Sequence, residues 1–224
     1  MSEENRKTLE IYEGYYGEFL AGTERRNKTV GEKLVQEKIK KKQKFWDKGF
    51  KILPRPAKIL EIGSGDGLGA KALMELGYLV TPSDAVEGFL REIRKNGLQP
   101  IKYNVLTDKL EQGYDGVLAW HVFVHFTKKD LLVALENLFQ VLRPGGRLIF
   151  DVQNGEGKGN KKSEWVDYAG DYHMGVERFF QYYSEDDVHS IVKQVGFKIV
   201  EIGVHKSSSS GWIRVVAEKL IEVD

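Results

Sequence analysis

The residues whose types and spacing best suit chemistry lie between Lys58 and Gly69, in the stretch KILEIGSGDGLG. Three glycines alternate there with Ser64 and Asp66, after a short apolar run and before a segment of helical type. Glycine has no Cβ, so a ligand can approach the bare backbone, and the first N–H groups of a helix point toward such a ligand. The stretch therefore predicts a binding turn between a strand and a helix.

Polar and ionisable side chains also follow the other apolar runs, where further strands would end. The positions are Asp84, Asn104 to Leu106, Trp120 to His125 and Asp151 to Asn154. In an open α/β sheet, ligands bind at the carboxyl ends of the strands. We therefore expect these positions to lie near the glycine turn.

His121 and His125 are four residues apart, which would place them on one face of a helical turn. A metal-binding pair is one interpretation, but the sequence offers no obvious third ligand and no Glu between them. The other interpretation makes His125 a buried histidine bonded to the backbone, and it is the one that we favour. We expect no metal.

Alternating strands and helices are predicted to position these residues. Strands are predicted at 59–62, 78–81, 100–103, 114–120, 147–152, 197–202 and 212–217, and helices at 70–76, 86–95, 131–142 and 185–195. Continuous apolar strands that alternate with helices are typical of a doubly wound, mostly parallel α/β sheet with helices on both faces. The loop from Gly203 to Gly211 is too short for a parallel crossover, so the last two strands are expected to form an antiparallel hairpin.

Residues 1–56 are predicted to form an N-terminal helical cap on the domain 57–224. The aromatic residues of segment 1–22 would pack on the domain, close over a ligand, or do both. Segment 24–58 holds thirteen Lys and Arg against four acids. This segment could bind nucleic acid, but a solvated helix face is the favoured interpretation because the whole chain carries a formal net charge of only +1.

Residues 155–183 interrupt the alternation with glycines, lysines and eight aromatic or histidine side chains. A connection of this length without secondary structure favours a binding loop or a lid inserted in the domain.

Composition excludes several classes of protein. The 224 residues are 41% hydrophobic and 30% charged, as in ordinary globular domains, and suggest one domain. With no cysteine, a disulfide scaffold, a thiolate metal site and a cysteine nucleophile are excluded. The polar N-terminus and the absence of an 18-residue apolar run predict a cytoplasmic protein without membrane contact.

Two ligand classes fit a glycine turn of this kind. A nicotinamide dinucleotide requires the spacing G-x-G-x-x-G, but the third glycine here, Gly67, comes one residue early. Asp66 would also place a carboxylate beside a pyrophosphate, which like charges disfavour. The turn therefore favours a ligand that carries positive charge and no phosphate, with an NAD-dependent oxidoreductase as an alternative.

On these residues the chain resembles the class I, Rossmann-like S-adenosylmethionine-dependent methyltransferases, of a small bacterial type. EIGSGDG at 61–67 is similar to the first motif of that family, and the resemblance extends to 78–84, 114–117, 142–148 and the terminal hairpin. It implies a seven-stranded sheet in the order 3-2-1-4-5-7-6 with an antiparallel C-terminal strand. It also implies S-adenosylmethionine as methyl donor, with S-adenosylhomocysteine as the product.

The resemblance implies roles for individual residues. Asp84 would accept hydrogen bonds from both ribose hydroxyls, and Asn104 would border the adenine. The full set expected to bind the cofactor is Glu61, Gly63, Ser64, Gly65, Gly67, Asp84, Ala85, Asn104, Val105, Leu106, Trp120, His121 and Tyr15. The residues expected at the acceptor are Tyr12, Tyr16, His125, Tyr172, Phe179 and Tyr182. His121 is the first candidate for a general base and His173 the second.

The expected reaction is methyl transfer to an oxygen or nitrogen nucleophile of a small molecule. The chain lacks the N/D-P-P-Y box of amino-methylating DNA enzymes, which argues against DNA as acceptor. Methylation of RNA or protein through the basic helix 24–51 is an alternative, and so is a non-catalytic scaffold or sensor that binds S-adenosylmethionine. The protein would be a monomer or a homodimer.

Overall fold

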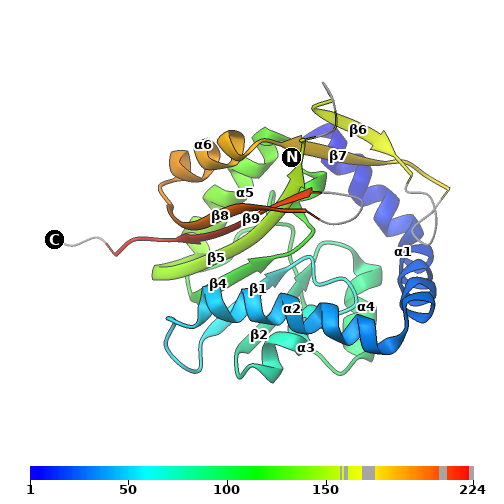
Figure 1. The fold of residues 1–224 in the computed structure, drawn as a ribbon, viewed down its shortest axis with the longest axis horizontal. Helices are drawn as coiled ribbons and strands as arrows, with labels where there is room; N and C mark the ends of the chain where they lie inside the picture. Colours follow the sequence, from blue (N-terminus) through cyan, green and yellow to red (C-terminus); the bar gives the residue numbers. More distant parts are fainter. Residues whose placement is uncertain (157, 159–160, 168–174, 207–210, 222–224) are drawn as a thin grey trace.

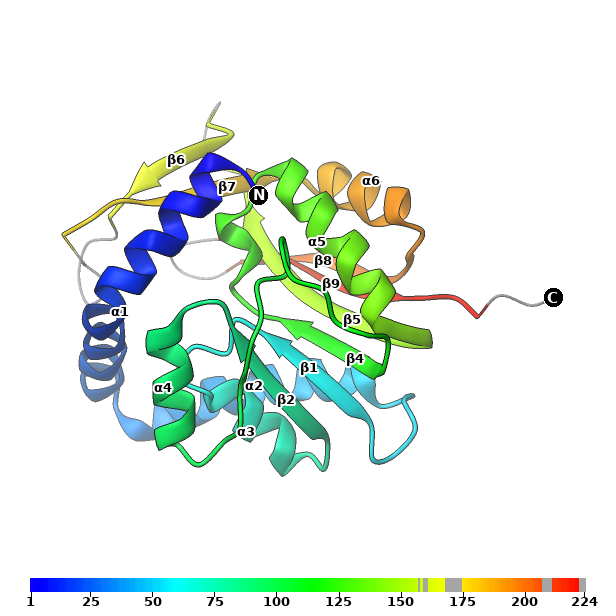
Figure 2. The ribbon, with the colours of Figure 1, turned by 180° about the vertical axis from the view of Figure 1, so that it is seen from behind.

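The computed structural model describes residues 1–156, 158, 161–167, 175–206 and 211–221. They form one mixed sheet with helices on both of its faces (Figures 1 and 2). The helices are α1 (Glu3–Val30), α2 (Glu32–Phe50), α3 (Leu68–Glu75), α4 (Glu87–Lys95), the short 3₁₀ helix η1 (Phe123–His125), α5 (Lys128–Val141) and α6 (Glu185–Val195). The strands are β1 (Lys58–Ile62), β2 (Leu79–Asp84), β3 (Ile101–Lys102), β4 (Tyr114–Ala119), β5 (Leu142–Asn154), β6 (Ser163–Val166), β7 (Arg178–Tyr183), β8 (Lys198–Lys206) and β9 (Gly211–Glu218).

The order of the predicted strands is confirmed. β3, β2, β1, β4 and β5 lie side by side and run parallel, β9 pairs antiparallel with β5, and β8 pairs antiparallel with β9. Numbered as the seven predicted strands, this is the order 3-2-1-4-5-7-6. The topology brings the carboxyl ends of β1, β2 and β4, and with them the polar positions after each strand, to one edge of the sheet.

Segment 155–183, which was expected to be a binding loop or lid, contains two strands. β6 and β7 form an antiparallel hairpin, and β7 extends the sheet by pairing in parallel with the last two residues of β5, Gln153 and Asn154. Every residue of β7 is buried. Its residues, RFFQYY, were assigned to a binding loop or lid because their burial depends on partners far away in the sequence.

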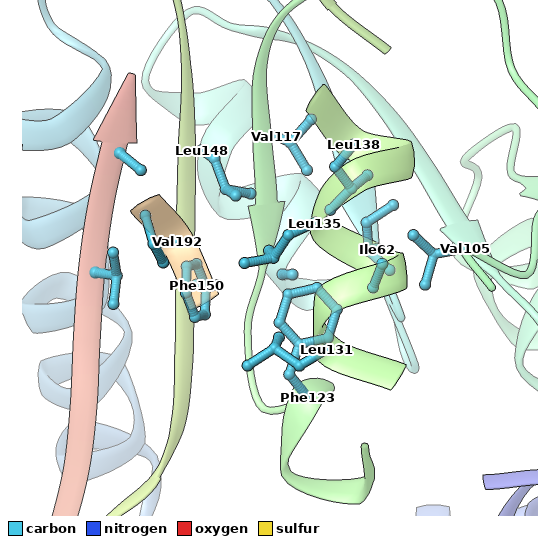
Figure 3. Packing of buried hydrophobic residues seen from close by; sticks show 14 of the residues in the cluster. Ile62, Val105, Val117, Phe123, Leu131, Leu135, Leu138, Leu148, Phe150 and Val192 are labelled. Atoms are coloured by element: carbon cyan, nitrogen blue, oxygen red, sulfur yellow. The ribbon is translucent and has the colours of Figure 1, made fainter. Parts of the chain in front are cut away.

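Two hydrophobic clusters hold the layers together. On one face, Leu131, Leu135 and Leu138 of α5 pack against Val117 and other strand residues, and α6 adds Val192 (Figure 3). On the other face, α2 and α3 cover the sheet, with Trp46 and Phe50 of α2 packed near Ile59, Leu118 and Ile149. Helix α2 is thus part of the core layer that covers the sheet.

The two N-terminal helices differ in how they are held. Along α1 only Asn5, Thr8 and Gly22 are buried, and the helix kinks at Tyr15, whose φ of −124° and ψ of 18° are non-helical. Helix α1 contacts α4, η1 and β7 at the carboxyl edge of the sheet (Figure 2). The aromatic helix predicted for 1–22 therefore continues to Val30 and lies over the edge where the glycine turn is found.

Candidate functional site

The glycine turn has the backbone conformation that its sequence predicts. Gly63, Gly65 and Gly67 all have positive φ, at 64°, 55° and 79°. A Cβ on Gly65 would meet no heavy atom within 4 Å, so this residue faces open space. Gly67 precedes the first turn of α3 in the left-handed conformation. The turn therefore presents bare backbone to a ligand, because left-handed backbone is readily adopted only by glycine.

Asp84, at the end of β2, points at this turn. Its Oδ2 accepts the Gly65 N–H at 3.0 Å and its Oδ1 accepts the Val86 N–H at 3.0 Å. Burial raises the pKa of the carboxyl to about 6, against the two backbone donors and the Ala85 N–H, which lower it. A nearly buried carboxylate thus lies beside the open backbone of Gly65, as predicted for a group that recognises a ligand there.

The pair Pro82–Ser83 before this acid also has a structural reason. Ser83 is fully buried, and its hydroxyl donates to the Glu61 carbonyl at 2.6 Å, while its N–H donates to the Ser64 hydroxyl at 3.1 Å. Pro82 precedes the two β2 residues that pair with β3, so its missing N–H removes no bond between these strands. Ser64 and Ser83 together fasten the glycine turn to β2.

Glu61 lies beneath the turn, and one oxygen of its buried carboxyl group has no hydrogen-bond partner among the described residues. Its Oε1 occupies the position that a Cβ on Gly69 would need, and its Oε2 is buried with no hydrogen-bond partner in the described part of the chain. Burial raises the pKa of Glu61 to about 8, and Asp66 and Asp84 raise it further, whereas Ser64 and the Ala70 N–H lower it. A buried acid with an unused oxygen at the first turn of a helix can be satisfied by a cationic ligand.

His121 and Asp151 form a pair at the ends of β4 and β5. The His121 N–H donates to Asp151 Oδ1 at 2.6 Å, and His121 Nδ1 lies 3.0 Å from Asp151 Oδ2. Asp151 is fully buried, whereas the His121 side chain is 41% exposed. Asp151 Oδ2 has no hydrogen-bond partner in the described part of the chain, so the ring lies at ion-pair distance and the hydrogen bond of the pair comes from the backbone N–H. An imidazole with its proton on Nδ1 at this position would present Nε2 as a general base.

The backbone of His121 is strained. It has φ 61°, and it is the one residue other than glycine with positive φ in the part of the chain that the structure describes. Such conformations cost about 1–3 kcal/mol and persist where the surroundings fix them. Here the hydrogen bond from the His121 N–H to Asp151 fixes the main chain of the residue.

The pair lies next to the glycine turn. Ile62 and Ala119, the last residues of β1 and β4, are register partners in the sheet. A Cβ on Gly63 would lie 2.5 Å from Val122 Cγ2, so the loop after β4 packs directly on the first glycine. The binding turn and the candidate base therefore share one site.

Aromatic and cationic side chains form the wall of this site on the α2 side. The His121 ring lies 4.1 Å from the Trp212 ring, measured between centroids. The Arg214 guanidinium lies 5.1 Å from the Trp120 ring centroid and 5.6 Å from that of Phe45. Trp120, predicted to contact the cofactor, is thus a wall between α2 and β9.

The residues predicted around the adenine are placed as follows. Val105 and Leu106 are buried in the core cluster of α5, and Ala85 is half-buried after Asp84. The side-chain oxygen of Asn104, Oδ1, already accepts a hydrogen bond from the Leu106 N–H at 3.0 Å. Asn104 therefore stabilises its own turn, and only part of its acceptor capacity remains for a ligand.

His125 has the role that we favoured from the sequence, a buried histidine bonded to backbone, and the alternatives of acceptor contact and metal binding are not supported. Its Nδ1 lies 2.6 Å from the Phe179 carbonyl oxygen and its Nε2 lies 3.0 Å from the Tyr12 hydroxyl. Burial lowers its pKa to about 4, so the ring is neutral. Tyr12 also accepts from Arg178 at 3.1 Å. These residues join α1 to η1 and β7, and we no longer place them at the acceptor.

Other predicted residues are divided between α1 and the hairpin. Tyr16 packs on Gly88 of α4 and its hydroxyl accepts from Arg91, and Tyr15 is 38% exposed at the kink. Phe179 is buried beside Trp165, and the Tyr182 hydroxyl donates to Glu164 of β6, away from the glycine turn. The hydroxyl of Tyr182, which was predicted at the acceptor, is thus used within the hairpin. Tyr172 and His173 lie outside the described residues.

Asp151, Lys42, Trp212 and Arg214 were missed as site residues from the sequence. Asp151 is an acid within an otherwise apolar predicted strand, and this pattern could have marked it as a functional residue. The sequence analysis named it only as one of the polar positions at the strand ends. Lys42 was counted with the basic residues of a solvated face. Its spacing from Ile39 and Trp46 places it on the inward stripe of α2, so that assignment was wrong for this lysine.

Comparison with known proteins agrees with this geometry. The family described as "Methyltransferase domain" matches residues 31–202, which is most of the chain. The chain therefore belongs to the methyltransferase domain family, and the resemblance to class I methyltransferases is confirmed. A curated relative, the ubiquinone biosynthesis O-methyltransferase of Dinoroseobacter shibae, is 29% identical over 165 residues. The match covers 66% of this chain and 64% of that relative's length.

Solved structures share the fold at low sequence identity. The magnesium protoporphyrin IX methyltransferase of Synechocystis PCC 6803, solved with S-adenosylmethionine, has a TM-score of 0.66 at 17% identity and covers 98% of both chains. The 1,6-didemethyltoxoflavin-N1-methyltransferase of Burkholderia thailandensis, solved with its acceptor and S-adenosylhomocysteine, has a TM-score of 0.64 at 19% identity. That match covers 92% of this chain and 89% of the other.

Two features are absent from the described residues, namely a helix that could span a membrane and a cluster of metal-ligating side chains. Within those ranges, no helix is long and apolar enough to cross a membrane. No group of three or more His, Asp or Glu side chains among them is arranged to hold a metal ion.

Proposed function

We propose that this protein transfers a methyl group from S-adenosylmethionine to an oxygen or nitrogen nucleophile of a small-molecule acceptor. The observation that carries the proposal is the His121–Asp151 pair, which lies directly beside the glycine turn. Membership of the methyltransferase family supports the reaction class. The pair itself supports catalysis in preference to a scaffold or sensor, which would need no oriented base.

The residues at the turn fit S-adenosylmethionine. Open space at Gly65 leaves room against the backbone, and Asp84 beside it suits the two ribose hydroxyls. The unused oxygen of Glu61 suits a cationic group, as the methionine ammonium is. The carboxylate of Asp66 would disfavour the pyrophosphate of a dinucleotide. These residues, with Gly63, Gly67 and the Asn104–Leu106 turn, are those that we propose hold the cofactor.

The catalytic contribution of the chain follows from the pair. When bound, S-adenosylmethionine supplies an activated methyl group on a sulfonium. His121 Nε2 takes the proton from an acceptor hydroxyl or ammonium, and Asp151 stabilises the imidazolium that results. General-base catalysis of this kind contributes about 10²–10⁴-fold, and alignment of the reactants can lower the barrier by up to about 7–11 kcal/mol.

A small-molecule acceptor is favoured over RNA or protein. The two solved relatives named above are methyltransferases of protoporphyrin and didemethyltoxoflavin, both small planar molecules. The basic segment offers less to a nucleic acid than its composition suggests, because Lys48 pairs with Glu201 and Lys42 faces inward. We further propose that residues 1–56 form a helical cap on the domain 57–224. The protein is proposed to work in the cytoplasm as a monomer or a homodimer.

The test is methyl release from labelled S-adenosylmethionine with a panel of phenol and amine acceptors. His121→Gln is expected to lower kcat by at least about 100-fold while the affinity for S-adenosylhomocysteine stays within a few-fold of wild type. His189→Gln, at an exposed position on α6, is the matched control and should match wild type. Full activity of His121→Gln, or no turnover of any acceptor by the wild type, would contradict the proposal.

A further inference from the structure

Lys42 and Arg214 are two cations that the proposed reaction does not use. Lys42 lies on the inward stripe of α2, between Ile39 and Trp46, which both belong to or pack on the apolar cluster. Arg214 lies on β9 directly opposite Asp151 of β5. Both residues therefore face the strand ends where His121 and Asp151 lie.

Lys42 and Arg214 share one buried acid, Asp151, whose charge acts to raise the pKa of both groups. In the described ranges no carboxylate lies within ion-pair distance of Lys42 or Arg214, and Arg214 Nε is buried without a hydrogen-bond partner. Burial lowers the pKa of both groups. The acids that act on Lys42 are Asp151 and Asp66, and the cations that oppose them are Arg26 and Arg214. Desolvated cations held without a close counter-ion are unfavourable unless a ligand supplies the anion.

The surroundings of Arg214 also limit the shape of such a ligand. Its guanidinium stacks over Trp120 and Phe45, and the His121 ring stands against Trp212. His205 contacts Phe45 on the same side, at 6.0 Å between ring centroids. Flat rings on several sides and a planar, bidentate donor favour a flat ligand with a carboxylate.

We propose that the acceptor is a planar aromatic compound with a carboxylate, which Lys42 and Arg214 bind while its nucleophile reaches His121. This inference rests on the proposed function and adds a substrate class to it. In this role, Lys42 and Arg214 determine specificity, because their positive charges favour an acidic acceptor over its neutral analogues. The methionine carboxylate of the cofactor is the competing partner for Lys42, and the experiment below separates the two.

The experiment measures binding of matched acids and amides to the full chain saturated with S-adenosylhomocysteine. The probes are 4-hydroxybenzoate with 4-hydroxybenzamide, and 6-hydroxy-2-naphthoate with its amide. We expect at least one acid to bind at least about tenfold more tightly than its amide. Arg214→Gln and Lys42→Met should each reduce that ratio to within about twofold. Lys41→Met, an exposed neighbour on α2, should keep the ratio of wild type.

Each result has a defined meaning. Equal binding of acid and amide by the wild type, or a ratio unchanged in both variants, overturns the inference. A loss of S-adenosylhomocysteine affinity in Lys42→Met with the ratio unchanged assigns that lysine to the cofactor and also overturns it. Arg214→Lys guards against misfolding, because it keeps the charge and should keep part of the preference. Methyl transfer by the wild type is measured separately, so failure of the substrate class and failure of the reaction are distinguishable.

Discussion

At the scale of single residues, Glu61 makes the stability of the protein depend on pH. Its pKa is raised from 4.5 to about 8 by burial in the folded state. For an acid whose folded pKa is raised, the stabilising contribution is fully present below the unfolded value. It is lost as pH rises toward the folded value, because the unfolded chain then releases a proton that the folded chain retains.

We therefore expect Glu61→Gln to flatten the pH dependence of the unfolding free energy. Between about pH 4.5 and 8, Glu61 should lower the unfolding free energy of the wild type as pH rises. The contribution of this one group to the slope is up to about 1.4 kcal/mol per pH unit. Asp84 adds the same sign of dependence only below its pKa of about 6, and His125 and His205, whose pKa values are lowered from 6.5, add the opposite sign below that value. The window from pH 7 to 8 therefore isolates Glu61 from these groups. Urea unfolding in that window measures the slope. The exposed Glu111→Gln is the control, and equal slopes in wild type and Glu61→Gln would rule out the buried acid as their cause.

Gly65 provides a second prediction at this scale. A valine there would place its side chain in the open space that we assign to the cofactor, so S-adenosylhomocysteine affinity should fall by at least about 100-fold, or about 2.8 kcal/mol. The matched control is Gly97→Val, because Gly97 also has positive φ and nothing within 4 Å of its Cβ, but lies after α4. Calorimetric titration compares them. Equal loss in both variants would mean that backbone strain alone weakens binding.

At the scale of elements, α6 shows how far local signals determine a helix. The Ser184 hydroxyl accepts from the Asp187 N–H, and the Asp187 carboxylate accepts from the Ser184 N–H, a complete capping box. Gly196 ends the helix in the left-handed conformation. The bounds predicted from Ser184, the acidic first turn and Gly196 are those observed.

Ser184→Ala should lower the unfolding free energy by about 1 kcal/mol, because the first turn loses the acceptor of an N–H group. Ser190→Ala, at an exposed position inside α6, removes a hydroxyl without a cap and should be neutral or slightly stabilising. Chemical denaturation of both variants gives the two free energies. Methyl transfer should be the same in both, because α6 packs with α5 on the face opposite α2. A Ser184→Ala protein as stable as wild type would show that the cap is not needed.

At the scale of the whole molecule, α1 is the element best placed to open and close the site. It has few buried residues, and Glu13 and Tyr16 fasten it to the start of α4, next to Asp84. A groove of about 620 Å³ runs between α1 and α2 and reaches Asp66 of the glycine turn. A ligand that binds at Asp84 and Gly65 would thus lie partly beneath α1.

We expect S-adenosylhomocysteine to slow amide hydrogen exchange along residues 3–30, because weakly buried helices open locally and a ligand beneath them would hold them closed. Exchange in α6 should not change, which provides an internal control. The measurement is hydrogen–deuterium exchange by mass spectrometry at saturating ligand. If peptides from α1 exchange equally fast with and without ligand while those around Gly65 slow down, α1 does not cover the cofactor.

Local patterns in the sequence were sufficient for the alternation of strands and helices, for the glycine turn and for the approach of Asp84 to it. The first two depend on residues near in the chain, and the third depends on the common edge at which parallel strands end. The order of the strands came from the resemblance to the family. The hairpin β6–β7 could not be predicted, since the burial of RFFQYY depends on β5 and α1. His125 was correctly placed as a buried residue, but its partner Tyr12 lies more than a hundred residues away and could not be named.

Only the tertiary structure decided which residues surround His121. Asp151 is 30 residues away in the chain, and Trp212 and Arg214 arrive on the antiparallel strand β9, whose register with β5 places Arg214 opposite Asp151. Lys42 arrives on α2, where its inward direction depends on which helix face packs on the sheet. The sequence thus determined the glycine turn, because the backbone freedom of glycine is a local property. The structure determined the surroundings of His121, because a pair of side chains exists only where distant segments meet.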